Sequence, residues 1–137
     1  MDPKPANIKN FIGATAICPN IKEARKILGE NLSAEECAVE LSSRFNHKYV
    51  FIKSGSEGIT LYDGKIHKVS TKVRTLEDVT GAGDTVAATL ILSLLVGLNA
   101  EESATLANYA AGIAVEKFGT AAVQQRELKQ RILEDID

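Results

Sequence analysis

The sequence predicts an α/β fold in which parallel strands and one β-hairpin are layered with helices. Short apolar runs bounded by turn residues indicate buried strands, and segments with helical periodicity lie between them. A glycine-rich turn stands directly before a long apolar segment. Strands that alternate with helices are typical of a parallel sheet covered by helices. With 137 residues, 45% of them hydrophobic and 25% charged, the chain has the composition of one compact domain.

The first strand and helix are predicted near the N-terminus. Residues 14–18 form a short apolar run that Pro19 closes, as expected of a buried strand. Asn20 can cap a helix that follows, since Glu23 stands three residues later at the capping-box position. Gly29 is expected to end this helix.

A second helix and three further strands follow. Ser33 and Glu36 repeat the capping pattern and predict a helix that runs towards Phe45. The Asp63-Gly64 pair is a strong signal for a hairpin with a two-residue turn. The strands are predicted at residues 49–53, 58–62 and 66–69.

Three helices are predicted in the second half. Residues 85–98 are apolar nearly all round, so this helix is expected to be buried centrally, and residues 97–99 break it. The next helix carries alanines at helical spacing that permit close approach of a neighbour or a flat ligand, and Gly119 is expected to end it. Residues 124–136 form a polar final helix with one apolar side, suited to covering the outer surface. The alanines are Ala104, Ala107, Ala111 and Ala114, and the apolar side is Leu128, Ile132 and Leu133.

Composition excludes several classes of partner. A net charge of −2 and a pI near 5.7 provide no general field for nucleic acid or an anionic membrane. The polar first ten residues do not resemble a signal peptide, and the longest apolar stretch is too short to span a membrane. Cys18 and Cys37 lack the spacing of a metal site, so a reduced, cytoplasmic setting is expected.

The turn at Gly81-Ala82-Gly83 is the strongest candidate for chemistry. Small residues before a helix leave its first backbone N–H groups unhindered, and such amides bind anions. Asp84 adds a carboxylate that can accept the proton of an attacking hydroxyl, so it is the candidate general base. Alternatively, the glycines only form a tight turn, while Asp84 and Thr85 favour the start of a helix.

Two other nucleotide-binding motifs fit poorly. A Walker P-loop requires Gly-Lys-Ser or Gly-Lys-Thr after its spacer, and Gly64-Lys65 is followed by Ile66 and has one spacer residue too many. A dinucleotide fingerprint requires a third glycine, whereas Gly83 is followed by Asp84-Thr85-Val86. A Rossmann oxidoreductase is therefore the weaker interpretation.

The run Asp78-Val79-Thr80-Gly81-Ala82-Gly83-Asp84-Thr85 resembles the C-terminal signature of ribokinase-like (PfkB) carbohydrate kinases. Thr89 departs from the alanine or glycine of many members. Other segments resemble family elements in the expected order: residues 19–23 its Asn-x-x-Glu motif, residues 53–58 its phosphate loop, and residues 107–112 its adenine-side helix. The resemblance covers nearly the whole chain and implies a ribokinase-like layered fold, C-terminal half only.

The resemblance also implies roles for individual residues with ATP and Mg²⁺. Asn20 and Glu23 would organise magnesium and its waters, while Gly81, Ala82 and Gly83 would form an anion hole beside Asp84. Contacts with ATP would come from Lys53, Ser54, Gly55, Ser56, Gly58 and Asn108. Taken singly, each motif also has a structural interpretation: a capping box, a turn, and a buried polar side chain.

Some members of this family also bind a monovalent cation such as K⁺ near the anion-binding turn. The corresponding positions in this sequence are Asp78, Thr80, Ala114, Lys117 and Gly119. Val123 stands where ribokinase has a hydroxyl residue that contributes to the cation site, and Asp78 can equally brace the turn.

Within the family, the sequence is most like heptose-phosphate kinases, the kinase part of ADP-heptose synthase. The resemblance therefore implies phosphorylation of a sugar or sugar phosphate, with turnover only after completion by an N-terminal half. An open sheet edge and exposed apolar surface would favour self-association or a complementing chain. The alternative function is a non-catalytic nucleotide-binding or interaction module derived from a sugar kinase.

Overall fold

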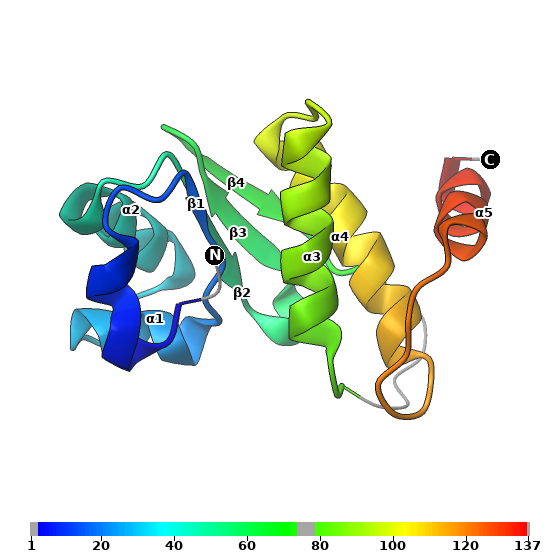
Figure 1. Ribbon diagram of the computed structural model, residues 1–137, viewed down its shortest axis with the longest axis horizontal. Helices are drawn as coiled ribbons and strands as arrows, with labels where there is room; N and C mark the ends of the chain where they lie inside the picture. The colour runs from blue at the N-terminus through cyan, green and yellow to red at the C-terminus, as the bar shows by residue number, and fades with distance from the viewer. Residues whose placement is uncertain (1–2, 74–78, 137) are drawn as a thin grey trace. The chain divides into compact units, whose positions relative to one another are not determined.

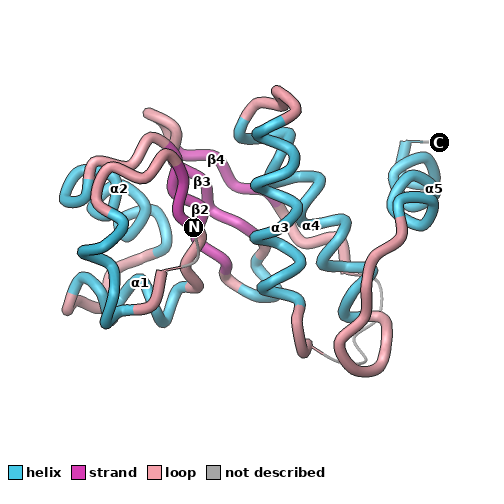
Figure 2. Tube along the Cα trace, viewed as in Figure 1, coloured by secondary structure: helices cyan, strands magenta, loops and turns pink. Residues whose placement is uncertain are grey.

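A computed structural model describes residues 3–73 and 79–136. Contacts divide the chain into two compact units, Met1–Val69 and Ser70–Asp137, and each is described by itself. Every strand of the described residues lies in the first unit, while the second unit is helical (Figure 2). No helix among residues 3–73 and 79–136 combines the length and the hydrophobicity needed to cross a membrane.

The first unit contains a mixed sheet of four strands (Figure 1). The strands lie in sequence order: β1 (Ala16–Ile17), β2 (Tyr49–Lys53), β3 (Ile59–Tyr62) and β4 (Ile66–Val69). β1 pairs with β2 in parallel, whereas the β2–β3 and β3–β4 pairs are antiparallel. The expected combination of parallel strands with one hairpin is confirmed.

Two local details differ from the sequence-based expectations. β1 contains two residues rather than five, although Thr15 and Pro19 on either side accept hydrogen bonds from the backbone N–H groups of Tyr49 and Lys53. The hairpin loop contains three residues, 63–65, because Tyr62 pairs with Ile66. Gly64 at the tip has φ +111°, a conformation that glycine adopts without the clash of a side chain.

Two capped helices cover the sheet of the first unit. α1 (Ile21–Leu28) begins after Asn20, and α2 (Ala34–Phe45) begins after Ser33, each with the predicted reciprocal capping box. Gly29 ends α1 in the left-handed conformation, as expected. Two short 3₁₀ helices, η1 (Pro5–Phe11) and η2 (Gly55–Glu57), complete this unit. Its core joins both helices and η1 to the sheet through Ile8, Ile17, Ala24, Leu28, Cys37, Ala38, Leu41, Val50 and Ile52.

The second unit contains three helices: α3 (Ala82–Leu95), α4 (Ala100–Val115) and α5 (Gln125–Ile136). α3 and α4 run side by side (Figure 1). The predicted face of small residues on α4 is largely buried, with Ala104, Ala107 and Ala114 at most 3% exposed. α4 ends at Val115, four residues before Gly119, because the N–H of Lys117 turns back to the carbonyl of Ala114.

The expectation that α3 is buried all round is wrong. Its apolar residues at 91, 92, 95 and 96 are exposed, because α4 covers only one side of the helix within this unit. Three hydroxyl residues at four-residue spacing mark a different side. The side chains of Thr85, Thr89 and Ser93 donate hydrogen bonds to the backbone carbonyls of Gly81, Thr85 and Thr89 respectively. Thr89 therefore satisfies its polar group within the helix.

Candidate functional site

In the first unit, the predicted magnesium and phosphate segments lie together at the carboxyl ends of β1 and β2. Asn20, which follows β1, forms an isolated parallel bridge with Lys53 at the end of β2. The N–H of Lys53 donates to the carbonyl of Pro19 at 3.0 Å. Ligands of parallel sheets bind at this end of the strands, so the arrangement suits a ligand site.

Asn20 and Glu23 form the capping box of α1. The side-chain oxygen of Asn20 accepts the N–H of Glu23 at 2.9 Å, and Oε2 of Glu23 accepts the N–H of Asn20 at the same distance. The other carboxylate oxygen, Oε1, accepts a hydrogen bond from Nζ of Lys4 at 2.8 Å. The structural role of the pair is thus present, and one oxygen of the Glu23 carboxylate is bound by a lysine side chain rather than by the backbone.

Lys4 is a contributor that the sequence-based reasoning did not single out. It lies nineteen residues before Glu23 and shares no motif spacing with it. It stands in a Pro-Lys-Pro segment that leads into η1, and η1 packs against α1.

The predicted phosphate loop is a closed turn. The N–H of Ser54 donates to the carbonyl of Gly58 at 2.9 Å. The residues between these two positions form η2. Gly55 and Gly58 both have positive φ, at +58° and +90°, while Gly55 and Ser56 are exposed. Oγ of Ser54 is buried and has no hydrogen-bond partner among the described residues. The hydroxyl of Ser54 is therefore an unsatisfied polar group within this loop.

In the second unit, the predicted anion hole forms the start of α3. Gly81 precedes the helix with φ +80°, so Ala82, Gly83 and Asp84 are its first three residues. The N–H of Thr85 closes the first turn by donating to the carbonyl of Gly81 at 3.0 Å. Asp84 is exposed, so its carboxylate is accessible to a reactant. The partial positive charge of a helix N-terminus favours an anion at this position.

Thr120 packs over Gly81 and is a second contributor that sequence reasoning missed. A Cβ atom added at Gly81 would lie 3.3 Å from Cγ2 of Thr120. The turn is therefore constrained both by its left-handed backbone and by a neighbouring side chain. No pattern in the sequence relates these two positions, which lie 39 residues apart.

Asn108 is held in a structural contact. It is 5% exposed, and its amide nitrogen donates to the carbonyl of Ser70 at 3.0 Å. One turn further along α4, a Cβ at Gly112 would lie 2.8 Å from the carbonyl oxygen of Lys72. These two residues bring residues 70–73 close to the helix, which supports the structural interpretation of Asn108. Its contact with ATP stays a prediction.

The positions proposed for a monovalent cation have varied surroundings. Asp78 lies outside the described residues, whereas Thr80 and Gly119 are exposed. Nζ of Lys117 donates to the carbonyl of Ala122 at 3.1 Å and to the carboxylate of Glu127 at 2.8 Å. The hydrogen bond from Lys117 is the main reason that the pKa of Glu127 lies below its ordinary value. Residues 3–73 and 79–136 contain no group of three or more His, Cys, Asp or Glu side chains able to hold a metal ion.

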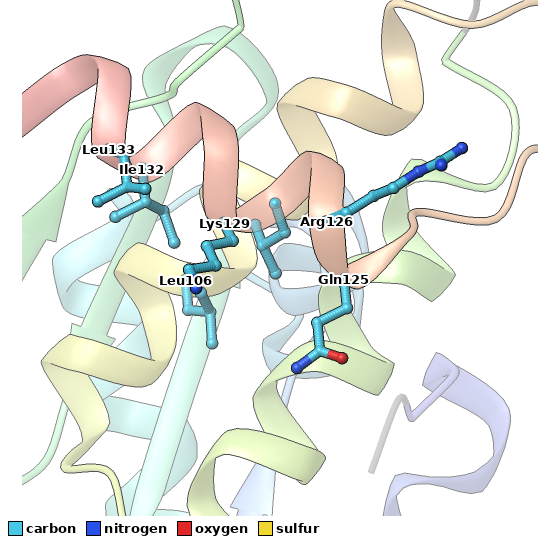
Figure 3. Close-up of a pocket in the computed structure, with 7 residues that line it drawn as sticks. Leu106, Gln125, Arg126, Lys129, Ile132 and Leu133 are labelled. Carbon is cyan, nitrogen blue, oxygen red and sulfur yellow. The ribbon is translucent and has the colours of Figure 1, made fainter.

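A separate apolar groove lies between α4 and α5 (Figure 3). Leu106 of α4 faces Leu128, Ile132 and Leu133 of α5, so the predicted apolar side of the last helix is confirmed. Gln125, Arg126 and Lys129 supply its polar margin. None of the residues predicted to bind ATP or a metal lines this groove.

Comparison with known proteins identifies the family of the chain. Residues 1–126 match the model of the pfkB family carbohydrate kinases. The chain belongs to this family. This match agrees with the resemblance inferred from residues 78–85 and from the motifs that flank them.

Curated relatives are bacterial proteins named Bifunctional protein HldE. The relative from Campylobacter concisus is 37% identical over 134 residues, and that from Desulfatibacillum aliphaticivorans is 39% identical over 138 residues. The matches cover 95% and 96% of this chain. The chain spans 28% of the length of each relative.

Solved structures confirm the fold. A ribokinase from Thermotoga maritima superimposes with a TM-score of 0.84 and 25% identity, over 93% of this chain and 45% of the ribokinase. The phosphofructokinase-2 of Escherichia coli, solved in complex with potassium, gives a TM-score of 0.84 with 19% identity over 95% of this chain and 43% of its own. The chain therefore matches less than half of each of these ribokinase-like structures.

Proposed function

We propose that this pfkB chain is the nucleotide-binding half of an ATP-dependent kinase that phosphorylates a hydroxyl of a sugar or sugar phosphate. The observation that carries the proposal is Asp84 on the first turn of α3, accessible and directly after the Gly81–Gly83 turn. The family match and the HldE relatives support sugar phosphorylation as the reaction class.

Asp84 is proposed as the general base. Its carboxylate accepts the proton of the acceptor hydroxyl as the hydroxyl oxygen bonds to phosphorus, while the bond from phosphorus to the ADP leaving group breaks. The amides at the start of α3 stabilise negative charge on the transferring group, because the helix N-terminus carries a partial positive charge. Proton acceptance by such a group typically contributes about 10²- to 10⁴-fold in rate.

The residues of the first unit are proposed to hold the phosphates and magnesium. Lys53 and the loop from Ser54 to Gly58 contribute a cation, hydroxyls and turn amides, and the unpartnered Oγ of Ser54 supports this assignment. Glu23 fits indirect binding of magnesium, since carboxylate oxygen suits Mg²⁺ and this metal usually retains several waters. When bound, magnesium would neutralise phosphate charge.

Binding of magnesium-ATP to the isolated chain, measured by calorimetry, tests the nucleotide-binding part of this proposal. Gly83→Val should weaken the binding, since a branched side chain at the second helical position crowds the amides. Ala88→Val is the matched control on an exposed position of the same helix. Equal affinity for ATP in the Gly83→Val variant and the unmodified chain would contradict the proposed anion hole.

A non-catalytic nucleotide-binding or interaction module is the second candidate. The observation that favours it is the share of the fold that the chain spans, 45% of the Thermotoga ribokinase. Addition of the N-terminal part of a pfkB kinase domain distinguishes the candidates. Restored transfer of phosphate from ATP to a sugar phosphate supports the kinase, and ATP binding without transfer by the assembled complex supports the module.

A further inference from the structure

The loop between α4 and α5, residues 116–124, is irregular and largely exposed to solvent. Residues 118–120 are exposed, and the side chain of Phe118 packs so little that the residue is 83% accessible. Burial of apolar surface therefore contributes little to the conformation of this loop. Polar contacts must supply most of what holds it in place.

Lys117 makes such contacts with both ends of the loop. Its Nζ donates to the carbonyl oxygen of Ala122 at 3.1 Å and to Oε2 of Glu127, on the first turn of α5, at 2.8 Å. The same carboxylate oxygen accepts the N–H of Gln124 at 2.8 Å. These three hydrogen bonds are called the Lys117 bridge. They join the end of α4, the backbone of the loop and the start of α5.

The Lys117 bridge differs from a simple surface ion pair. The side chains of Lys117 and Glu127 are 30% and 34% exposed, so water has only partial access to the two charges. Each hydrogen bond of the bridge has a charged donor or a charged acceptor, and such bonds are stronger than those between neutral groups. An ammonium that leaves this position gives up a carbonyl as well as a carboxylate. The bridge can therefore keep an otherwise exposed loop closed.

Thr120 lies within the loop that the bridge closes, and it meets the glycine-rich turn. A Cβ atom added at Gly81 would lie 3.3 Å from Cγ2 of Thr120. Gly81 is the residue before α3, and its carbonyl accepts the N–H of Thr85 at 3.0 Å. Both segments belong to the second unit. The loop thus contacts the residue at which α3 begins.

We propose that the Lys117 bridge positions Thr120 against Gly81 and thereby fixes the backbone amides at the start of α3. The inference rests on the proposed function, which assigns these amides to phosphate. Lys117 is then a positioning residue that acts through the loop. Without the bridge the loop gains conformational freedom, the turn loses its neighbour, and the amides no longer share one orientation. Ligands that carry phosphate should bind more weakly, and ligands without phosphate should not.

Hydrogen exchange of the isolated chain, followed by NMR, tests the bridge without a ligand. The N–H groups of Ala82 and Thr85 donate to the carbonyls of Val79 and Gly81 at 3.2 Å and 3.0 Å, so their exchange reports the order of the turn. Lys117→Met keeps a long side chain but removes the ammonium. It should speed exchange of these two amides about fivefold relative to residues 88–91 in the middle of α3. Lys117→Arg, which retains the charge and the donors, should restore slow exchange.

Two controls separate the bridge from a general loss of stability or charge. Arg131→Met breaks the ion pair that joins α5 to Glu116, at the C-terminal end of α4. It should lower the free energy of unfolding without changing the relative exchange at the turn. Lys129→Met removes an exposed positive charge from the same helix and should change neither property.

The contact with the turn is tested at Thr120 itself. Thr120→Ser removes Cγ2 and should reproduce the faster exchange, whereas Thr120→Val retains a methyl group and should not. If Lys117 acts through Thr120, the combined Lys117→Met and Thr120→Ser variant should exchange no faster than the more affected single variant. Fully additive effects would show that the two residues act independently and would overturn the inference.

Calorimetry connects the bridge with phosphate binding. Lys117→Met should weaken binding of magnesium-ATP about fivefold and leave the affinity for adenosine unchanged. Unchanged relative exchange at the turn, or an equal rise in the Arg131→Met variant, would overturn the inference. If Lys117→Met speeds exchange in a chain that does not bind ATP, the bridge is supported and the proposed nucleotide site is contradicted. If ATP binds equally to the Lys117→Met variant and the unmodified chain, the nucleotide site is supported and the role of the bridge is contradicted.

Discussion

The carboxylate of Glu23 is shared between Lys4 and the first turn of its own helix. Nζ of Lys4 donates to Oε1 at 2.8 Å, and the N–H of Asn20 donates to Oε2 at 2.9 Å. One oxygen therefore stabilises α1, and the other meets a cation that approaches from outside the helix. This division allows the structural role of the residue to be separated from its proposed role with magnesium.

Glu23→Gln is expected to leave the stability of the chain nearly unchanged while weakening magnesium-ATP binding by about tenfold. Glutamine can maintain the capping box, since its side-chain oxygen also accepts the N–H of Asn20, but it lacks the charge that attracts a hydrated cation. Calorimetry at several magnesium concentrations measures the effect. Glu36→Gln, in the equivalent capping box of α2, is the control and should change neither property. Equal magnesium dependence in both variants would refute the assignment of Glu23.

Asp84→Asn is expected to reduce phosphate transfer by the completed enzyme about 10²- to 10⁴-fold, because the amide does not accept the proton. ATP affinity should remain within a few-fold of the original value. Transfer rates and calorimetry provide the two measurements. Glu102→Gln changes the acidic residue at the same position of α4, so it controls for the general effect of charge near a helix N-terminus. A transfer rate that Asp84→Asn leaves unaltered would rule out this residue as the base.

Gly81→Ala is expected to destabilise the chain by about 1–2 kcal/mol, because alanine at φ +80° is strained. The contact with Thr120 adds to this cost. Gly119→Ala provides a matched comparison, since Gly119 has φ +70° but nothing within 4 Å of an added Cβ. The free energies of unfolding of the two variants should therefore differ, with Gly81→Ala the less stable. The reverse order would contradict the packing of Thr120 over the turn.

Gly112→Ala should also destabilise the chain, by about 1–3 kcal/mol, through overpacking against the backbone. An exposed helical glycine would show the opposite sign, since alanine has the higher helix propensity by about 1 kcal/mol. The added Cβ would lie 2.8 Å from the carbonyl oxygen of Lys72, which belongs to the backbone and cannot move aside as a side-chain end can. Thermal or denaturant unfolding gives the sign, and stabilisation would contradict the close approach of residues 70–73 to α4.

The buried side chain of His47 is expected to make the folded chain less stable in mild acid. Burial lowers its pKa below the ordinary value, although the hydrogen bond between Nδ1 and the carbonyl of Ala14 partly opposes this shift. The unfolded chain therefore binds the proton more readily, and stability present above about pH 6.5 falls as the pH decreases towards the folded-state pKa. His47→Gln should reduce this dependence when free energies of unfolding are compared between pH 7 and pH 5. An identical pH dependence in both proteins would exclude a contribution from His47.

Local sequence signals predicted the elements of this fold well. The capping boxes at Asn20 and Ser33 lie where the helices begin, because such caps depend on residues three positions apart. The mixed sheet followed from apolar runs and the Asp63-Gly64 turn, although its loop has one more residue than expected. The family signature around Asp84 identified the kinase fold, which the comparisons confirm.

Contacts between residues that are distant in the sequence could not be predicted from it. Lys4 beside Glu23 and Thr120 over Gly81 depend on how separate segments pack, and neither pair has a characteristic spacing. The error at α3 has a different cause. A helix that is apolar all round was expected to be buried on every side. The composition of a helix does not reveal which of its sides pack against other described residues, and part of α3 is exposed.

The start of α3 differs from the other capped helices in one respect. α1, α2 and α4 begin with Asn20, Ser33 and Asn99, whose side chains satisfy helix amides, whereas the residue before α3 is Gly81. Gly81 has no side chain, and its left-handed backbone differs from the extended backbone of the three capping residues. The start of α3 therefore receives no side-chain cap from the residue that precedes it. An anion bound there would supply the missing acceptor, so α3 is expected to gain more stability from an anionic ligand than the helices that are already capped.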